Sequence, residues 1–215
     1  MEIKNKILER NLIYDNTIVL KYHIEYPQIV PDSTVYIRRF NLYNENIALS
    51  LQQKAENELF KEAIELYKFN KKNNYPTMVY EVYQNYKITF NSWKIISLFI
   101  DEYTFTGGAH GNTIRTSQTW DLSRGRQIEL YQFFNNPYFI LQILKNIKMQ
   151  IEENPEIYFD DACCLLIDTF NPQSFYLDQR SIIIYFQQYD IAPYSSGIRE
   201  FSIFTALLFW YKSEL

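Results

Sequence analysis

The chain lacks the residues that mark a nucleic-acid binder or a disulfide-stabilised domain. Its 21 Lys and Arg are outnumbered by 25 Asp and Glu, which gives a net charge of −4. No basic stripe is present that could release counterions from nucleic acid. The only cysteines, Cys163 and Cys164, are adjacent, and adjacent cysteines rarely bridge each other without strain. The composition therefore excludes nucleic acid as a partner and a disulfide framework as a source of stability.

Long apolar runs are missing as well. No stretch approaches the roughly 18 apolar residues of a membrane-spanning helix. Met1 to Arg10 is charged throughout, unlike the apolar centre of a signal peptide. As the sequence is written, we expect a cytoplasmic protein without a membrane span. The alternative is an extracytoplasmic protein from which an N-terminal anchor has been removed.

Residues that hold metals or cofactors are scarce. The two histidines, His23 and His110, lie far apart in the sequence, and no zinc-ligand spacing occurs. The acidic pairs lack the alternating pattern of a calcium loop, and no glycine-rich loop of the phosphate-binding type is present. We therefore expect no metal and no cofactor.

Glycine is rare, and it is concentrated at one junction. Three of the five glycines fall in the short stretch Tyr103–Gly111: Gly107, Gly108 and Gly111. An apolar run from Trp93 to Phe105 leads in, and a polar alternating run from Asn112 to Leu122 leads out. Only glycine reaches positive φ without steric cost. We expect the junction to adopt a backbone conformation closed to other residues, with His110 hydrogen-bonded to hold it.

Hydrophobic periodicity predicts an α+β fold. Residues 18–26 alternate and predict a strand that Pro27 and Pro31 end. From Asn41 to Asn70 apolar residues recur every three or four positions, which predicts one long amphipathic helix. Residues 77–105 then predict two strands and Thr113 to Leu122 a third, joined as an antiparallel meander.

The second half predicts helices followed by a hairpin. A helix begins at Asn136-Pro137 and runs to about Glu153, and a short third helix carries Cys163. Residues 175–177 and 181–186 form the hairpin, residues 201–204 a last strand, and residues 205–212 a short terminal helix. No repeat or linker interrupts the chain, so residues 1–215 are expected to form one compact domain from segments 15–112 and 120–208. The predicted fold is an antiparallel meander packed against a long N-terminal helix and a second helix.

Four stretches, in the right order, resemble the RsiV-like and PdaC-like family of extracytoplasmic domains. Tyr103–Gly111 resembles the family signature Y-x-Y-T-G-G-A-H-G, and Tyr26–Ile29 resembles its N-terminal signature. Trp120–Leu130 with the following Phe133-Phe134, and Phe175–Tyr194 with Gly197, resemble its later segments. The resemblance implies an α+β domain of largely unknown function. One family member is the lysozyme-binding sensor domain of a membrane-bound anti-sigma factor, and another precedes a polysaccharide deacetylase domain without performing that chemistry.

The leading functional hypothesis is a non-catalytic binding domain. Its expected partner, implied by the resemblance, is a lysozyme-like protein or a peptidoglycan fragment. The candidate ligand-binding residues are Tyr103, His110, Tyr189 and Tyr194. The residues expected to shape the motifs are Gly107, Gly108, His110, Gly111, Gly125, Pro193 and Gly197.

Two other functions stay open at this point. One is a hydrolase that uses His110 with Ser117 or Asp121, although the sequence has no G-x-S-x-G elbow. The other is an intracellular structural or regulatory homo-oligomer. The sequence itself leaves the oligomeric state open.

Overall fold

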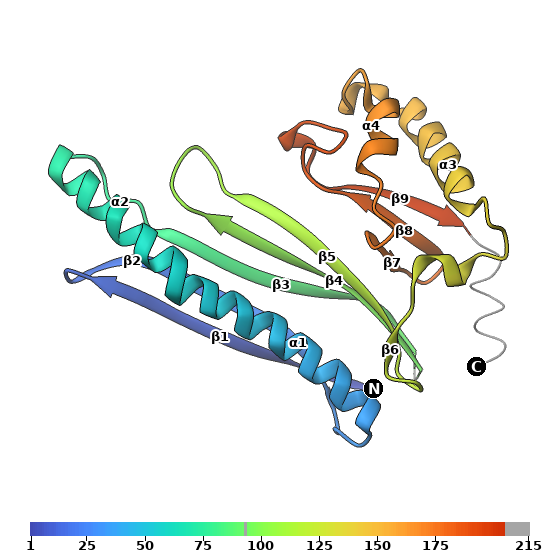
Figure 1. The fold of residues 1–215 in the computed structure, drawn as a ribbon, viewed down its shortest axis with the longest axis horizontal. Helices are drawn as coiled ribbons and strands as arrows, with labels where there is room; N and C mark the ends of the chain where they lie inside the picture. The colour runs from blue at the N-terminus through green and yellow to red at the C-terminus, as the bar shows by residue number, and fades with distance from the viewer. Residues whose placement is uncertain (93, 205–215) are drawn as a thin grey trace. The chain divides into compact units, whose positions relative to one another are not determined.

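The computed structural model describes residues 1–92 and 94–204 (Figure 1). The chain divides into two compact units, here called unit 1 and unit 2. Unit 1 comprises Met1–Tyr86 and Ile100–Ile114, and unit 2 comprises Lys87–Phe99 and the chain from Arg115 onward. That the whole chain forms one domain stays a prediction. The terminal helix predicted for residues 205–212 lies outside the described residues.

Unit 1 opens with a long β-hairpin that the sequence pattern did not reveal. Strand β1 (Glu2–Tyr14) pairs antiparallel with β2 (Thr17–Val30). The two turn residues, Asp15 and Asn16, have φ angles of 50° and 58°. Two successive left-handed residues make the turn that matches the twist of a two-residue hairpin, and Asp and Asn are the residues that tolerate it.

Strand β2 confirms the strand predicted over residues 18–26, but Pro27 does not end it. The strand continues through Pro27, which lies opposite Asn5 of β1, and stops at Val30 before Pro31. The other neighbour of β2 is β3 (Tyr80–Asn91), which pairs only with Leu20–Ile24. Proline is tolerated where a strand has a partner on one side only, so the missing N–H does not break the ladder here.

The long helix is confirmed and begins earlier than predicted. It runs without a break through α1 (Val35–Lys54), the π-helical segment η1 (Ala55–Leu59) and α2 (Phe60–Asn73). The Thr34 hydroxyl caps its start by accepting a hydrogen bond from the Ile37 N–H at 3.1 Å. Asn74 ends it with a left-handed φ of 57°.

The helix covers one side of β1, β2 and β3, and in Figure 1 it runs along the blue hairpin. Every third or fourth helical side chain is buried against the strands, as the amphipathic pattern requires. The buried contacts come from Leu12, Val19, Leu20, Tyr22, Ile24, Tyr26, Ala48, Leu51, Ala55, Leu59, Ala63, Tyr67, Tyr80 and Val82. Because the helix connects β2 to β3, those two strands are parallel.

The remaining strands confirm the meander. β3, β4 (Ile95–Phe105) and β5 (Asn112–Asp121) are neighbours in chain order within a six-stranded sheet, β1-β2-β3-β4-β5-β6. Strand β6 (Arg126–Gln127) follows the turn predicted around Gly125 and pairs antiparallel with β5. Among the described strands, the parallel β2–β3 pair departs from the predicted antiparallel order.

Unit 2 contains the second sheet and the shorter helices. The elements are η2 (Leu130–Phe133), α3 (Phe139–Glu153), η3 (Pro155–Ile157), α4 (Ala162–Thr169), β7 (Phe175–Leu177), β8 (Ser181–Phe186), η4 (Tyr194–Ser196) and β9 (Arg199–Phe204). The three strands form an antiparallel sheet in the order β7-β8-β9, which confirms the predicted hairpin and last strand. Ile143, Ile147 and Ile151 of α3 share one core with Phe186 and Phe201 of this sheet. None of the helices in the described residues has the length and apolarity needed to cross a membrane.

Candidate functional site

The glycine junction between β4 and β5 adopts the expected backbone. Gly107 and Gly108 have φ angles of 88° and 114°, a region that side chains other than glycine rarely enter. A Cβ on Gly107 would also lie 3.1 Å from the Leu66 side chain and 3.4 Å from Met78 Sδ. The loop therefore needs glycine at Gly107 for both conformation and space.

Gly111 serves a different purpose from its two neighbours. Its φ is ordinary, but a Cβ there would overlap the ring of Tyr103. The Tyr103 ring also lies 6.2 Å from the ring of Tyr83 on β3. Gly111 is thus the backbone surface against which the Tyr103 ring packs, a role that sequence spacing alone did not identify.

His110 is exposed, and its Nδ1 lies 2.9 Å from the carbonyl oxygen of its neighbour Gly111. This contact is local to the loop, as expected for a histidine that holds the junction. Among the described residues, no group of three or more His, Cys, Asp and Glu side chains could hold a metal ion.

The two residues considered as partners of His110 have structural partners of their own. The Ser117 hydroxyl donates to the carbonyl oxygens of Phe175 at 2.5 Å and Gln173 at 3.2 Å. Asp121 is buried at the end of β5, where its carboxylate accepts from the Ser123 N–H at 2.9 Å. These contacts give Ser117 and Asp121 structural roles in the sheet and in the turn after β5.

The environment of Asp121 explains its ionisation. Burial raises the pKa of this carboxyl, but hydrogen bonds from Ser123 and the guanidinium of Arg124 at 3.0 Å outweigh it. The pKa is therefore held below its ordinary value, and the ionised group organises the turn that Gly125 closes with a φ of 63°. A carboxylate with a lowered pKa and with several hydrogen bonds to the turn is better suited to stabilising that turn than to accepting a proton.

The closing loop of unit 2 carries a tyrosine pair, of which Tyr189 is exposed and Tyr194 is half-buried. Tyr189 is 55% exposed, and its ring lies 5.8 Å from that of Tyr194, with 34° between the ring planes. Between them, Ile191 and Ala192 are buried in the core of unit 2 and fix the loop, while Pro193 is exposed. The two aromatic rings therefore stand on an anchored segment.

The backbone around this pair is constrained. Tyr189 itself has a φ of 69°, which is uncommon for a bulky residue, and Gly197 ends the loop with a φ of 67°. The Asp190 carboxylate accepts the Gln187 N–H at 2.7 Å and holds the turn. Burial raises the pKa of this carboxyl, and the hydrogen bond opposes that shift.

Gln187 ties the loop to β5, and sequence analysis missed it. Its side-chain amide accepts the Arg115 N–H at 3.0 Å and donates to the Arg115 carbonyl oxygen at 2.6 Å. The Gln187 amide thus satisfies both main-chain hydrogen-bonding groups of Arg115, as a neighbouring strand would do. The Arg115 guanidinium lies 3.6 Å from the centre of the Phe99 ring and pairs with Glu200. The only sequence signal was the polar residue that directly follows the apolar run of β8.

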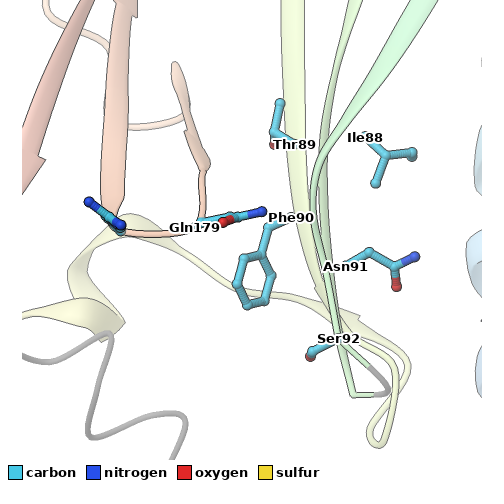
Figure 2. A pocket seen from close by; sticks show the side chains of 7 residues that line it. Ile88, Thr89, Phe90, Asn91, Ser92 and Gln179 are labelled. Carbon is cyan, nitrogen blue, oxygen red and sulfur yellow. The ribbon is translucent and has the colours of Figure 1, made fainter.

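Each unit has a hollow on its surface. One, of about 670 Å³, lies in unit 2 beside the β3–β4 turn and the β7–β8 turn. Figure 2 shows the Gln179 side chain reaching from the β7–β8 turn toward Phe90. The second, of about 410 Å³, lies in unit 1, and Glu9, Lys21, His23 and Tyr83 are among its lining residues.

His23 in the unit 1 hollow is held between two carboxylates, as a half-exposed residue of the polar side of β2. Its Nε2 lies 3.1 Å from Glu25 and its Nδ1 lies 3.0 Å from Glu9 on β1. Hydrogen bonding to Glu25 raises the pKa of this imidazole, desolvation opposes the rise, and hydrogen bonding to Glu9 adds a further, smaller rise.

This clamp predicts a pH-dependent stability. The group's pKa is higher in the folded chain, so its contribution is complete below the unfolded value of about 6.5. It is lost as pH rises through the higher folded pKa. We expect His23→Gln to destabilise the protein more at mildly acidic pH than at alkaline pH in urea denaturation. In a Glu9→Gln/Glu25→Gln background, the destabilisation caused by His23→Gln should not depend on pH. A pH dependence as large as in the wild-type background would contradict the assignment of the effect to these two carboxylates.

These features define an α+β protein built from a helix-covered hairpin unit and a second sheet-and-helix unit. Residues 13–113 match the family model described as Deacetylase PdaC. Residues 132–205 match DUF3298, described as a protein of unknown function. The two matches lie one after the other along the chain, and they confirm the PdaC-like resemblance found in its sequence.

Similar proteins fit this assignment. The Peptidoglycan-N-acetylmuramic acid deacetylase PdaC of Bacillus subtilis (strain 168) is 27% identical over 134 residues. That match covers 60% of this chain but only 28% of the Bacillus protein, so the chain corresponds to little more than a quarter of its relative.

Two solved structures share the fold at 17% identity. A DUF3298 family member from Bacteroides fragilis NCTC 9343 has a TM-score of 0.70, with 94% of this chain and 90% of that chain covered. A DUF3298 family protein from Pseudomonas aeruginosa PAO1 has a TM-score of 0.63, with 97% and 93% covered. At this level of identity, the likeness shows the fold alone.

Proposed function

We propose that this chain is a non-catalytic binding domain whose ligand is cell-wall glycan. The observation that carries the proposal is the pair of Tyr189, which is exposed, and Tyr194, which is half-buried, 5.8 Å apart on an anchored loop. A tyrosine presents a large apolar face with a hydroxyl at its edge. That combination suits a sugar ring, which has apolar C–H faces and a hydroxylated rim.

The loop is organised before any ligand arrives. Tyr189 is held at positive φ by the turn that Asp190 and Gln187 form, and Gln187 is fixed in turn to the main chain of Arg115. Strained residues of this kind concentrate at binding and active sites. A preorganised aromatic pair loses little conformational entropy on binding, so more of the contact energy appears as affinity.

Peptidoglycan is the glycan that the comparisons favour. The Bacillus subtilis relative is named as a deacetylase of N-acetylmuramic acid in peptidoglycan. This chain matches 28% of that protein, so we take from its name the class of target and not the reaction. A domain that holds the polymer is a natural companion to chemistry performed elsewhere in a relative.

The absence of catalysis is part of the proposal. His110 and Asp121 make hydrogen bonds close by in the chain, to Gly111 and to the turn after β5, and Ser117 bonds to the carbonyl oxygens of Gln173 and Phe175. General acid–base chemistry requires a base within hydrogen-bond reach of a nucleophile. The described contacts of these three side chains favour scaffold roles over that arrangement.

Co-sedimentation with purified peptidoglycan sacculi tests the proposal. We expect the wild-type protein to sediment with the sacculi, and Tyr189→Ala and Tyr194→Ala each to weaken binding by about 5- to 10-fold, the loss of one aromatic contact. Tyr131→Ala is the matched control, since Tyr131 is 60% exposed in unit 2 outside the loop and its loss should leave binding unchanged.

The competing functions give different results. Binding that survives both loop substitutions would overturn the tyrosine site. Calorimetric binding to lysozyme without binding to sacculi would identify the protein partner that the family resemblance implies. Release of acetate or of reducing ends from the sacculi, abolished by His110→Ala, would instead establish an enzyme.

A further inference from the structure

We propose that the outer edge of β1 binds an extended acidic strand of a partner protein. Strand β1 spans 13 residues and stands first in the six-stranded sheet, with β2 as its one strand neighbour in the described part of the chain. Its outer main-chain N–H and C=O groups can therefore pair with another strand. This edge belongs to unit 1, so the inference is independent of the tyrosine loop in unit 2.

The side chains of β1 alternate between two rows. The row on the helix side includes Glu2, Lys4, Lys6, Leu8, Arg10 and Leu12. The row on the other side includes Ile3, Ile7 and Glu9. Leu8 and Leu12 contact the unit 1 core, and Arg10 Nη1 lies 3.5 Å from Glu56 of η1, which places the first row. Glu9 reaches His23, which places the second.

The helix-side row is basic and accessible. Lys4 and Lys6 are exposed, and the Arg10 side chain is 63% exposed. In the opposite row, Ile7 is 48% exposed although it is large and apolar. The edge thus combines a line of positive charge on one side with exposed apolar groups on the other.

A second copy of the chain fits this edge poorly. Two copies related by a two-fold axis would pair β1 antiparallel with itself, and residues of the same row would stand opposite each other. An axis at Ile7 sets Lys4 against Arg10, and one at Leu8 sets Lys6 against Arg10. Like charges directly opposite destabilise a strand pair, so these two registers are disfavoured. An axis at Lys6 sets Lys6 against Lys6 at its centre, while Glu2 faces Arg10 on either side.

The same row selects an acidic partner. A strand that places Glu or Asp opposite Lys4 and Lys6 replaces each repulsion with an attraction. Apolar residues at the alternate positions of that strand would cover Ile3 and Ile7. The main-chain ladder supplies affinity, and the two rows supply specificity, as in other cases of strand addition. The partner's strand therefore alternates acidic and apolar residues.

Fluorescence anisotropy with two labelled synthetic peptides tests this inference. One peptide alternates valine and glutamate, and its twin alternates valine and lysine. We expect the wild-type chain to prefer the glutamate peptide by about 10-fold, the combined effect of a few cross-strand charge pairs. The double variant Lys4→Glu/Lys6→Glu should invert that preference.

A matched charge change elsewhere provides the control. Lys61→Glu/Lys72→Glu alters two exposed lysines of α2 and should leave the preference as in the wild type. The comparison is between two ligands on one protein, so partial unfolding of a variant lowers both affinities and cannot imitate an inversion. Equal affinity for the two peptides, or a preference for glutamate that survives Lys4→Glu/Lys6→Glu, would overturn the inference. So would a dimer in light scattering that the same double variant alters.

Discussion

Phe201→Ala is expected to lower the free energy of unfolding by about 3–5 kcal/mol, the usual cost of removing a buried phenylalanine ring. Phe201 is 1% exposed in the core of unit 2. Its ring meets Phe186 edge-on at 5.8 Å and stacks with Tyr158 at 6.1 Å. The substitution removes both contacts and leaves a cavity between rigid strands. Urea denaturation measures the loss.

The matched control for this substitution is Phe69→Ala. Phe69 lies on α2 and is 57% exposed, so its ring loses little contact with the protein when it is removed. We expect a change below about 1 kcal/mol. A loss at Phe69 as large as that at Phe201 would show that burial in unit 2 is not the source of the effect.

Phe201→Ala also tests whether the chain is one domain. Strands β3, β4 and β5 each contribute residues to both units, so unfolding of unit 2 disrupts strands that unit 1 also uses. Far-UV circular dichroism reports mainly the long helix of unit 1, whereas the fluorescence includes the signal of Trp120, which is buried in unit 2. We expect the two signals to change together in Phe201→Ala, as in a two-state transition. A shift of the fluorescence curve alone would establish two independent domains.

The sequence predicted those elements whose burial is periodic. The long helix buries one stripe against three strands, β3 alternates in burial over its first half, and β4 begins with a continuous buried run, so the sequence pattern of each element could be recognised. Strand β1 escaped because an edge strand buries little: Leu12 is its one buried residue. The available signal was Asp15-Asn16, two residues suited to left-handed turns, directly before the alternating run of β2.

The sequence predicted those features of the candidate site that depend on residues close together in the chain. Clustered glycine identified the left-handed backbone at Gly107 and Gly108, since that requirement belongs to the residues themselves. The pairing of Gln187 with Arg115 joins residues far apart in the chain, and no local pattern encodes such a contact. Gly111 likewise needs its small size because of where the Tyr103 ring lies.

This difference between glycines leads to the second large effect. Gly111→Val is expected to destabilise the protein by about 2–3 kcal/mol, because overpacking forces neighbouring groups to move. A Cβ at Gly111 would overlap the Tyr103 ring, which would have to leave its place beside Tyr83. Gly108→Val should cost about 1–2 kcal/mol from backbone strain alone, since nothing lies within 4 Å of its Cβ position.

A second substitution separates clash from strain. In a Tyr103→Ala background the ring is gone, so adding Gly111→Val should lower the free energy of unfolding only slightly. Gly108→Val should lower it by the same amount as in the wild type. The interaction free energy from these two double-mutant cycles, measured by urea denaturation, should be large for Gly111 and near zero for Gly108. Additive losses at Gly111 would mean that the tyrosine is not what keeps this position small. The expected interaction energies would show that the Gly107–Gly111 stretch meets two separate structural requirements. The backbone at its start must have positive φ, and the residue at its end must be small enough for an aromatic ring to pack against it.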